Sequence, residues 1–111
     1  MKITILILNW NGKILLETFL PSVVKNTKGH EIFLIDNGSK DDSVAFVKSK
    51  FPQINIIEFS RNYGYSQGYN MAVKQVKADV YCFLNSDVRT TPNWLEPIEE
   101  IFATQPQACI L

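Results

Sequence analysis

The sequence has no excess of positive or negative charge and no long apolar stretch, and it contains only two cysteines. Eleven lysines and arginines balance eleven aspartates and glutamates in a chain of 111 residues. Binding to nucleic acid needs a basic surplus or patch that contacts phosphates, so we expect no nucleic-acid partner. The aliphatic run at residues 5–8 is far shorter than the roughly 20 apolar residues of a membrane-spanning helix.

The cysteine content argues against a disulfide framework. Cys82 and Cys109 each stand beside apolar neighbours, which indicates buried thiols and a reducing compartment. Met1 and Lys2 lead directly into a strand-like run, without the apolar segment and cleavage site of a signal peptide. We therefore expect a cytoplasmic protein, and the length suits one compact domain with its own core.

Short apolar runs rich in β-branched residues alternate with segments of helical periodicity. These runs predict five strands, at residues 2–9, 32–36, 55–59, 80–85 and 108–111. The first and fourth are almost continuously apolar, which is typical of strands covered on both faces. Apolar residues at helical spacing predict four helices, around residues 15–24, 44–51, 71–76 and 94–102.

Prolines and polar residues mark the expected helix boundaries. Pro21 should kink or restart the first helix, because it lacks an N–H group. Ser39 and Asp42 have the spacing of a capping box at the start of the second helix. Pro92 suits the first position of the fourth helix, whose first turns Pro97 makes less regular.

The alternation of strands and helices predicts an α/β fold. We expect an open, mostly parallel sheet with helices on both faces, built from right-handed crossovers. Ligands of such sheets bind outside the carboxyl ends of the strands. The polar residues that follow the strands are therefore the candidate site.

The first two strand ends are rich in Asn, Asp and Gly. Asn9, Trp10, Asn11 and Gly12 follow the first strand; they offer a flat aromatic face near tight backbone, or form a turn whose Trp packs on the core. Asp36 ends the second strand, where a carboxylate can accept hydrogen bonds from a ribose or base. The residues after it equally suit a turn followed by a helix cap.

The next two strand ends carry groups suited to phosphate and metal. Arg61 can pair with a phosphate, and Gly64 and Gly68 stand on either side of an expected helix start. This segment is neither a Walker loop nor a Rossmann fingerprint. Asn85 and Asp87 would point to the same side of an extended segment and together hold a hard divalent cation; alternatively they are a polar strand end before a turn.

Together these four segments resemble the family 2 glycosyltransferases, and especially their bacterial rhamnosyltransferase-like branch. The matching stretches are ILNWNG at 7–12, DNGSKDDS at 36–43, RNYGYSQGYN at 61–70 and LNSDV at 84–88. Each stretch is weak by itself, but their order at successive strand ends is specific. The resemblance implies the GT-A fold, a Rossmann-like fold of nucleotide-diphospho-sugar transferases.

The resemblance also implies an activity and a nucleoside pocket. Family members transfer a sugar from a nucleoside diphosphate to an acceptor hydroxyl with inversion at the anomeric carbon. Asn9 and Trp10 would line the base, with Trp10 as the stacking aromatic. Asp36 would hydrogen-bond the base, and Asn11 would lie nearby in the same pocket.

The remaining candidates are assigned by the resemblance to the diphosphate and the metal. Arg61 and Asn62 would lie near the diphosphate or base edge, and Gly68 would shape the helix start beneath it. Asp87 would bind Mg²⁺ or Mn²⁺, and Asn85 would contact the ribose or sugar. The family motif has an acid where this chain has Asn85, so we expect metal binding that depends on bound nucleotide diphosphate.

In the family, the catalytic base lies well downstream of the metal motif. The resemblance therefore assigns the whole chain to the donor-binding half and places the base after Leu111. It implies a glycan or lipid-linked glycan acceptor, surface polysaccharide synthesis, and association of the complete protein with the inner face of the membrane. We expect the chain alone to be inactive and to self-associate through a truncated edge that includes Ile110.

Two alternatives stay open on the residues alone. A nucleotidyltransferase would share the sheet and the metal carboxylate, but would carry a Gly-rich basic loop after the first strand, where Lys13 is the nearby cation. A non-catalytic nucleotide-binding or scaffold module is the second alternative. Preference for nucleoside diphosphates, for triphosphates or for neither would distinguish the three.

Overall fold

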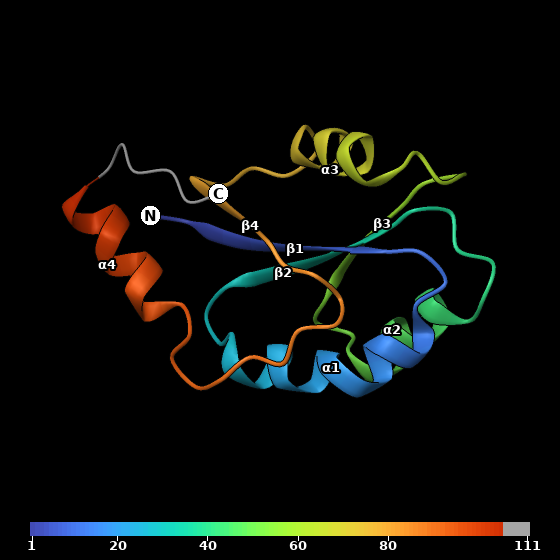
Figure 1. Ribbon diagram of the computed structural model, residues 1–111, viewed down its shortest axis with the longest axis horizontal. Coiled ribbons are helices and arrows are strands. Elements are labelled where there is room, and N and C mark those ends of the chain that lie inside the picture. The colour runs from blue at the N-terminus through green and yellow to red at the C-terminus, as the bar shows by residue number, and fades with distance from the viewer. Residues whose placement is uncertain (106–111) are drawn as a thin grey trace.

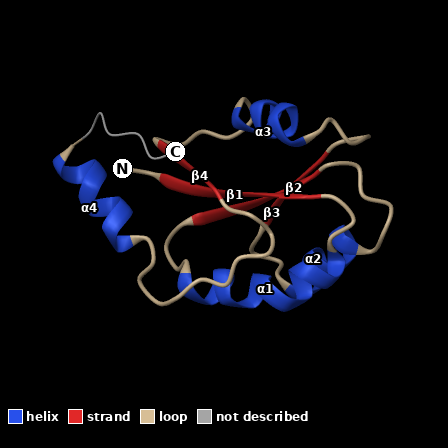
Figure 2. Cartoon of the chain, viewed as in Figure 1, coloured by secondary structure: helices blue, strands red, loops and turns tan. Residues whose placement is uncertain are grey.

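The computed structural model describes residues 1–105, in which strands and helices alternate along the chain (Figures 1 and 2). The predicted strand at 108–111, with Ile110 and Leu111, lies outside the described residues. The elements in chain order are β1 (Ile3–Asn9), α1 (Lys13–Asn26), β2 (Glu31–Asp36), α2 (Ser43–Lys50), β3 (Asn55–Glu58), α3 (Tyr65–Val73), β4 (Val80–Phe83) and α4 (Glu96–Thr104).

The four strands form one parallel sheet in the order β3-β2-β1-β4. Asn9 pairs with Asp36 and Asp36 with Glu58, so three neighbouring strands end level with one another. The chain builds outward from β1 in one direction through β2 and β3, and then crosses to place β4 on the other side. This reversal of strand order lies between β1 and β4, and open α/β sheets bind ligands at such a point.

Helices cover both faces of the sheet, as the sequence predicts. Figure 1 shows α1 and α2 below the sheet and α3 above it. The larger buried cluster joins the α1 and α2 side of the sheet and includes Ile3, Ile5, Ile7, Leu16, Leu20, Val23, Ile32, Leu34, Val47, Ile54 and Leu95. The smaller cluster lies beneath α3 and consists of Leu6, Ile35, Tyr69, Ala72 and Val76. Alternate residues of β1 and β2 thus enter opposite cores.

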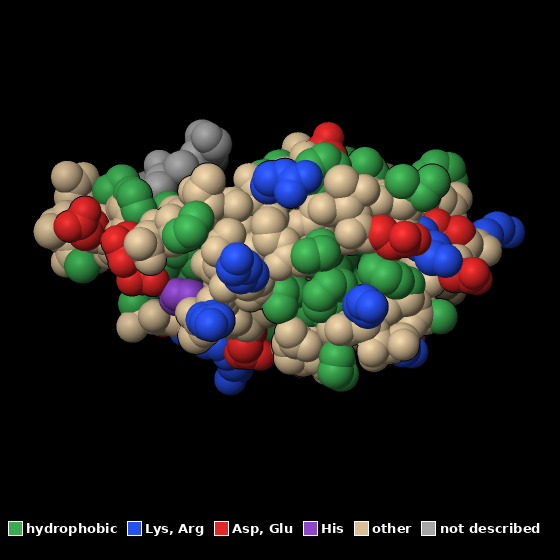
Figure 3. Space-filling model, turned by 90° about the horizontal axis from the view of Figure 1, so that it is seen from below, with side chains coloured by type: hydrophobic (Ala, Val, Ile, Leu, Met, Phe, Trp, Pro, Cys, Tyr) green, Lys and Arg blue, Asp and Glu red, His purple; other side chains and the backbone are tan. Residues whose placement is uncertain are grey.

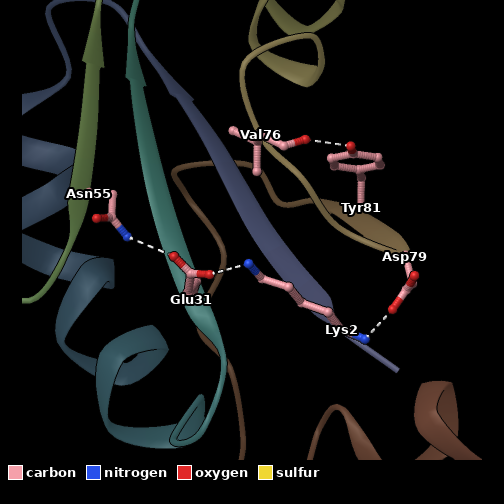
Figure 4. Close-up of polar contacts among 6 residues, drawn as sticks. All are labelled: Lys2, Glu31, Asn55, Val76, Asp79 and Tyr81. Carbon is pink, nitrogen blue, oxygen red and sulfur yellow. Dashed lines mark hydrogen bonds and ion pairs between the residues drawn. The ribbon is translucent and has the colours of Figure 1, made fainter.

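Polar contacts join the starts of the strands at the edge opposite the candidate site (Figure 4). Lys2 Nζ lies 2.6 Å from Glu31 Oε1, and the backbone N–H of Lys2 donates to Asp79 Oδ2 at 2.6 Å. Asn55 Nδ2 donates to Glu31 Oε2 at 3.4 Å. These groups are solvent-exposed, so their contribution to stability is small and screened by salt.

The chain that follows β4 crosses back beneath the sheet and is held to α1 (Figure 1). Thr90 Oγ1 donates to the Ser22 carbonyl at 2.9 Å, and Asn26 Nδ2 donates to the Thr90 carbonyl at 3.1 Å. Further along, α4 lies beside the amino edge of the sheet, where His30 Nε2 is 2.9 Å from Glu99 Oε1. The glutamates of α4 are therefore remote from the carboxyl edge.

Two local predictions are wrong, and a third is narrowed. α1 does not restart at Pro21 but continues through it, so a kink there stays a prediction; the exposed position leaves water to hydrate the carbonyl that loses its N–H partner. Pro97, instead of Pro92, occupies the first turn of α4. β4 is an edge strand of the four-stranded sheet and is only partly buried, with Phe83 51% exposed; an apolar run alone does not distinguish an edge strand from a central one.

The outer surface of α1 and α2 carries dispersed charge. In Figure 3 this face shows basic side chains separated by apolar and polar ones. Within residues 1–105, no helix is long and apolar enough to cross a membrane.

Candidate functional site

The carboxyl ends of β1, β2 and β3 bring three of the predicted segments together. The backbone ladder extends past the strands, because Asn37 N–H donates to the Asn9 carbonyl at 2.8 Å and Phe59 N–H donates to the Asp36 carbonyl at 2.8 Å. The turns that carry Trp10 and Arg61 therefore start from one rim, on either side of Asp36.

The β1–α1 turn exposes an aromatic ring. Trp10 is 56% exposed, so the alternative in which it packs on the core is wrong. Asn11 adopts φ 50°, a left-handed conformation that Asn tolerates. A Cβ at Gly12 would lie 2.5 Å from Asn9 Oδ1, so the Asn9 side chain would have to shift to admit any other residue there. The result is a flat apolar face held at the rim.

Asn9 and Asp36 form a buried polar pair behind this rim, 1% and 3% exposed. Asn9 Nδ2 donates to Asp36 Oδ1 at 3.0 Å, and Ser39 N–H donates to Asp36 Oδ2 at 3.0 Å. Each carboxylate oxygen keeps capacity for a further hydrogen bond. The structure therefore places Asn9 level with Asp36, where its amide orients the carboxylate.

Ser39 joins the turns after β1 and β2. Its hydroxyl lies 3.2 Å from Asn9 Nδ2 and accepts the N–H of Asn11 at 2.8 Å. In return, Lys40 N–H donates to Asn11 Oδ1 at 2.7 Å. The predicted capping box is wrong, because α2 begins at Ser43 with no side-chain cap at Asp42. The position of Ser39 directly after the Asp-Asn-Gly turn was the feature of the sequence that could have indicated this role.

Asp41 connects the starts of α1 and α2. Its carboxylate accepts the N–H of Lys13 at 3.2 Å and the N–H of Ser43 at 3.0 Å, and it is also bonded by the Ser43 hydroxyl. Burial by itself would raise the pKa of Asp41, but these hydrogen bonds hold that pKa below its ordinary value. The Asp41 carboxylate thus holds the turn after β2 against the first residues of α1 and α2, where a negative charge is favourable.

The turn after β2 is packed directly on the loop after β3. Asn37, 2% exposed, accepts the Tyr63 N–H at Oδ1 and donates from Nδ2 to the Gly64 carbonyl, both at 3.0 Å. Gly38 has φ 75°, and a Cβ there would lie 2.5 Å from the Arg61 carbonyl carbon. Only glycine combines this backbone with this proximity. Sequence analysis assigned no site role to Asn37.

Arg61 and Asn62 lie in the exposed part of that loop. The Arg61 guanidinium carbon is 4.6 Å from the centre of the Tyr63 ring, within the range of a cation–π contact. Hydrogen bonds with Ser60 and Arg61 lower the pKa of Tyr63. Asn62 Oδ1 accepts the Gly64 N–H at 2.7 Å, so Asn62 shapes the loop that leads into α3.

Gly68 lets α3 approach the sheet. It lies in the first turn of α3, and a Cβ there would be 3.1 Å from Leu8 Cδ1 and 3.2 Å from Asn37 Nδ2. Both neighbours are the ends of side chains. The start of α3 therefore lies against the ends of β1 and β2. The place of Gly68 beneath a bound diphosphate stays a prediction.

A tyrosine stands where β1 and β4 separate. The Tyr69 hydroxyl accepts the N–H of Leu8 at 3.2 Å and lies 3.5 Å from the carbonyls of Leu6 and Leu84. Its ring stacks on Phe83, with centroids 4.4 Å apart. Burial raises the pKa of Tyr69 to about 12. Where β4 leaves β1, the Tyr69 hydroxyl thus accepts the Leu8 N–H in place of a strand carbonyl. Nothing in the sequence pattern indicated this role.

The Asn-x-Asp segment leaves the sheet early. Phe83 pairs with Leu6, so β4 ends about 10 Å before the end of β1. Asn85 follows the strand, while Ser86 and Asp87 lie in a turn. The prediction of an extended segment through Asp87 is therefore wrong, and the alternative of a polar strand end before a turn describes the backbone.

The Mg²⁺ or Mn²⁺ ion that the resemblance implies would find few protein ligands near Asp87. Asp87 and Asn85 are exposed, and no ion pair engages Asp87 within the described chain. Residues 1–105 contain no cluster of three or more His, Cys, Asp or Glu side chains suited to a metal. One free carboxylate fits a Mg²⁺-type site in which phosphates complete the coordination, and does not fit an all-protein site.

Solved structures share this architecture. Staphylococcus aureus TarS 1–349 aligns with a TM-score of 0.81 at 19% identity, over 96% of this chain and 33% of that one. Its complex with UDP-GlcNAc gives a TM-score of 0.82 at 20% identity, over 96% and 32%. The mannosyltransferase PcManGT of Pyrobaculum calidifontis, in complex with GDP-Man and Mn²⁺, gives 0.70 at 17% identity, over 79% and 28%. These likenesses show the GT-A fold.

Sequence comparison agrees with the fold. The uncharacterized glycosyltransferase YkcC of Bacillus subtilis (strain 168) is 24% identical in an alignment 98 residues long, which covers 78% of this chain and 30% of that protein. The chain thus spans about a third of the length of the relatives it matches. The family described as glycosyl transferase family 2 matches residues 4–111. The chain belongs to glycosyl transferase family 2.

Proposed function

We propose that the protein containing this chain is a glycosyltransferase that uses a nucleoside-diphosphate sugar, and that residues 1–111 form its donor-binding half. The observation that carries the proposal is that three neighbouring strands end at one rim, from which the chain presents the exposed Trp10, the buried carboxylate of Asp36 and the exposed Arg61. Solved relatives in complex with UDP-GlcNAc and GDP-Man support a donor of this class.

Each group has a task that its position suits. The Trp10 face stacks on the base, and Asp36 accepts a hydrogen bond from a base N–H with the lone pairs that Asn9 and Ser39 leave free. Arg61 pairs with the diphosphate, where a guanidinium offers a planar set of donors. The stiff backbone behind these side chains limits the ordering cost of binding.

A divalent cation suits the turn after β4. We propose that Asp87 holds Mg²⁺ or Mn²⁺ together with the donor's phosphates, and that Asn85 contacts the ribose or sugar. The PcManGT complex with GDP-Man and Mn²⁺ supports a metal in this fold. A bound cation would supply positive charge that stabilises the departing diphosphate.

The reaction we propose is a direct displacement with inversion at the anomeric carbon. The acceptor hydroxyl attacks the face of the sugar opposite the diphosphate, and a carboxylate takes its proton. We propose that the base comes from outside residues 1–105, since the glutamates of α4, the carboxylates that follow the turn with Asp87, lie beside the amino edge of the sheet. The chain alone is then inactive.

The acceptor we propose is a glycan or lipid-linked glycan, in surface polysaccharide synthesis at the cytoplasmic face of the membrane. The rhamnosyltransferase-like branch stays a prediction, because the relatives with named donors carry UDP-GlcNAc or GDP-Man. Self-association of the isolated chain also stays a prediction, since Ile110 and Leu111 lie outside the described residues.

Calorimetric titration of the complete protein tests the proposal. We expect UDP, dTDP or GDP to bind more tightly with Mg²⁺ or Mn²⁺ than without. Asp87→Ala should abolish the metal-dependent part of the affinity and leave the circular dichroism spectrum unchanged. Asp79→Ala is the matched control, because Asp79 is an exposed carboxylate at the opposite end of the same strand.

The outcomes separate the candidate functions. Retained metal dependence in Asp87→Ala would contradict its assigned role. Preference for nucleoside triphosphates would indicate nucleotidyl transfer, and binding of neither class would indicate a scaffold.

A further inference from the structure

Asn37 is the buried connection between the turn after β2 and the loop that carries Arg61. Its backbone N–H is bonded to Asn9, and its side chain holds both the N–H of Tyr63 and the carbonyl of Gly64. A side chain that donates and accepts at once is needed for this pair of contacts, and an amide supplies both groups.

Tyr63 connects Asn37 to the guanidinium of Arg61. Tyr63, whose backbone Asn37 holds, presents its ring 4.6 Å from the Arg61 guanidinium carbon, and the same ring packs edge-on against Phe59 at 5.7 Å. Arg61 itself is exposed and has no ion-pair partner within the described part of the chain. The position of its charge therefore depends on the loop backbone that Asn37 holds.

We propose that Asn37 is a positioning residue, which holds the Arg61–Gly64 loop so that the Arg61 guanidinium meets the diphosphate while Asp36 meets the base. This inference rests on the proposed function, because it assigns Arg61 to the phosphates. Asn37 is buried and does not touch the donor. It links the nucleoside end of the site to the phosphate end, because it follows Asp36 in sequence and holds the backbone of Tyr63 and Gly64 in the loop that carries Arg61.

Two substitutions at position 37 separate its donor from its acceptor. Asn37→Asp keeps the shape and the acceptor for Tyr63 N–H but loses the donor to the Gly64 carbonyl. Asn37→Ala loses both. Each lost hydrogen bond leaves a buried partner unsatisfied. The isosteric Asn37→Asp loses one of these bonds where Asn37→Ala loses two, so it is the variant measured, with its fold checked by circular dichroism.

The measurement is the affinity of the complete protein for UDP and GDP, and for uridine and guanosine, with Arg61→Ala in parallel. We expect Asn37→Asp to weaken diphosphate binding about tenfold, the equivalent of about 1.4 kcal/mol, and nucleoside binding less than about twofold. In the Arg61→Ala background, Asn37→Asp should add less than about a further twofold loss, since it acts through Arg61.

Three results would overturn the inference. Equal losses for nucleosides and diphosphates would mean that Asn37 supports the fold of the whole pocket. Additive effects of Asn37→Asp and Arg61→Ala would mean that it acts independently of Arg61. Unchanged diphosphate affinity in Asn37→Asp would mean that the loop needs no such anchor. If the unmodified protein binds no nucleotide, the proposed function fails first, and the inference fails with it.

Discussion

Replacing Gly38 with alanine tests how tightly the two halves of the site rim are packed. Gly38 has φ 75°, and an added Cβ would lie 2.5 and 2.6 Å from the carbonyl and α carbons of Arg61. Carbon atoms normally approach to about 3.5–4.0 Å, so the Arg61 backbone must move by about 1 Å. The left-handed backbone adds a cost of about 1–2 kcal/mol for a residue with a Cβ.

Gly29 is the matched control for this substitution. It has φ 87°, but an added Cβ meets nothing within 4 Å, so Gly29→Ala carries the backbone cost alone. In Gly38→Ala the displaced loop also strains the Asn37 contacts to Tyr63 and Gly64, at about 0.5–1.5 kcal/mol for each hydrogen bond. We expect a total loss of about 2–5 kcal/mol for Gly38→Ala and about 1–2 kcal/mol for Gly29→Ala.

Urea unfolding followed by circular dichroism gives both values. Nucleoside diphosphate affinity provides a second readout, which should fall for Gly38→Ala and stay unchanged for Gly29→Ala. Equal losses of stability in the two variants would refute the reasoning, because the contact with Arg61 would then contribute nothing.

The other predictions concern Tyr69, Asp41 and Gly68. Tyr69→Phe leaves the Leu8 N–H without its partner and should cost about 1–3 kcal/mol in urea unfolding. Because the pKa of Tyr69 is raised to about 12, its stabilisation holds below pH 10 and is lost as pH rises towards 12; Tyr69→Phe should lack that alkaline loss, and an unchanged alkaline profile would contradict the burial of the phenol. The lowered pKa of Asp41 means that its stabilisation is present above pH 3.8 and lost as pH falls through the folded value. Asp41→Asn should therefore be less stable than the unmodified protein at pH 7, with a difference that shrinks as pH falls below 3.8, and a constant difference would exclude the charge as its cause. Gly68→Ala adds a Cβ against two side-chain ends and gains about 1 kcal/mol of helix propensity; its unfolding free energy should stay within about 1 kcal/mol of the unmodified value, and a larger loss would show that Leu8 and Asn37 cannot yield.

The fold followed from local sequence patterns because each pattern has a direct physical cause. Apolar runs such as residues 3–9 predict buried strands, and periodic segments between them require parallel crossovers. The predicted polar strand ends also proved correct for three strands, since parallel strands must end at one edge. The fourth strand ended early, because sequence periodicity does not report where a strand leaves its neighbour.

The polar contacts within the site depended on tertiary structure. The sequence placed Ser39 in a helix cap, a local role that serine often fills. In the fold its hydroxyl instead meets Asn9 and the Asn11 backbone, which are near in space and remote in sequence. Asn37 and Tyr69 were missed for the same reason, since their partners come from other strands and loops.

The sequence by itself determined the order of strands and helices, the edge at which polar residues gather, and the family to which those residues belong. Tertiary structure decided which of them face outward and which hold others in place. Trp10 and Arg61 are exposed, while Asn9 and Asn37 are buried behind them. Local propensity and spacing act within a few residues along the chain, whereas burial and hydrogen-bond partners are set by segments that meet only after folding.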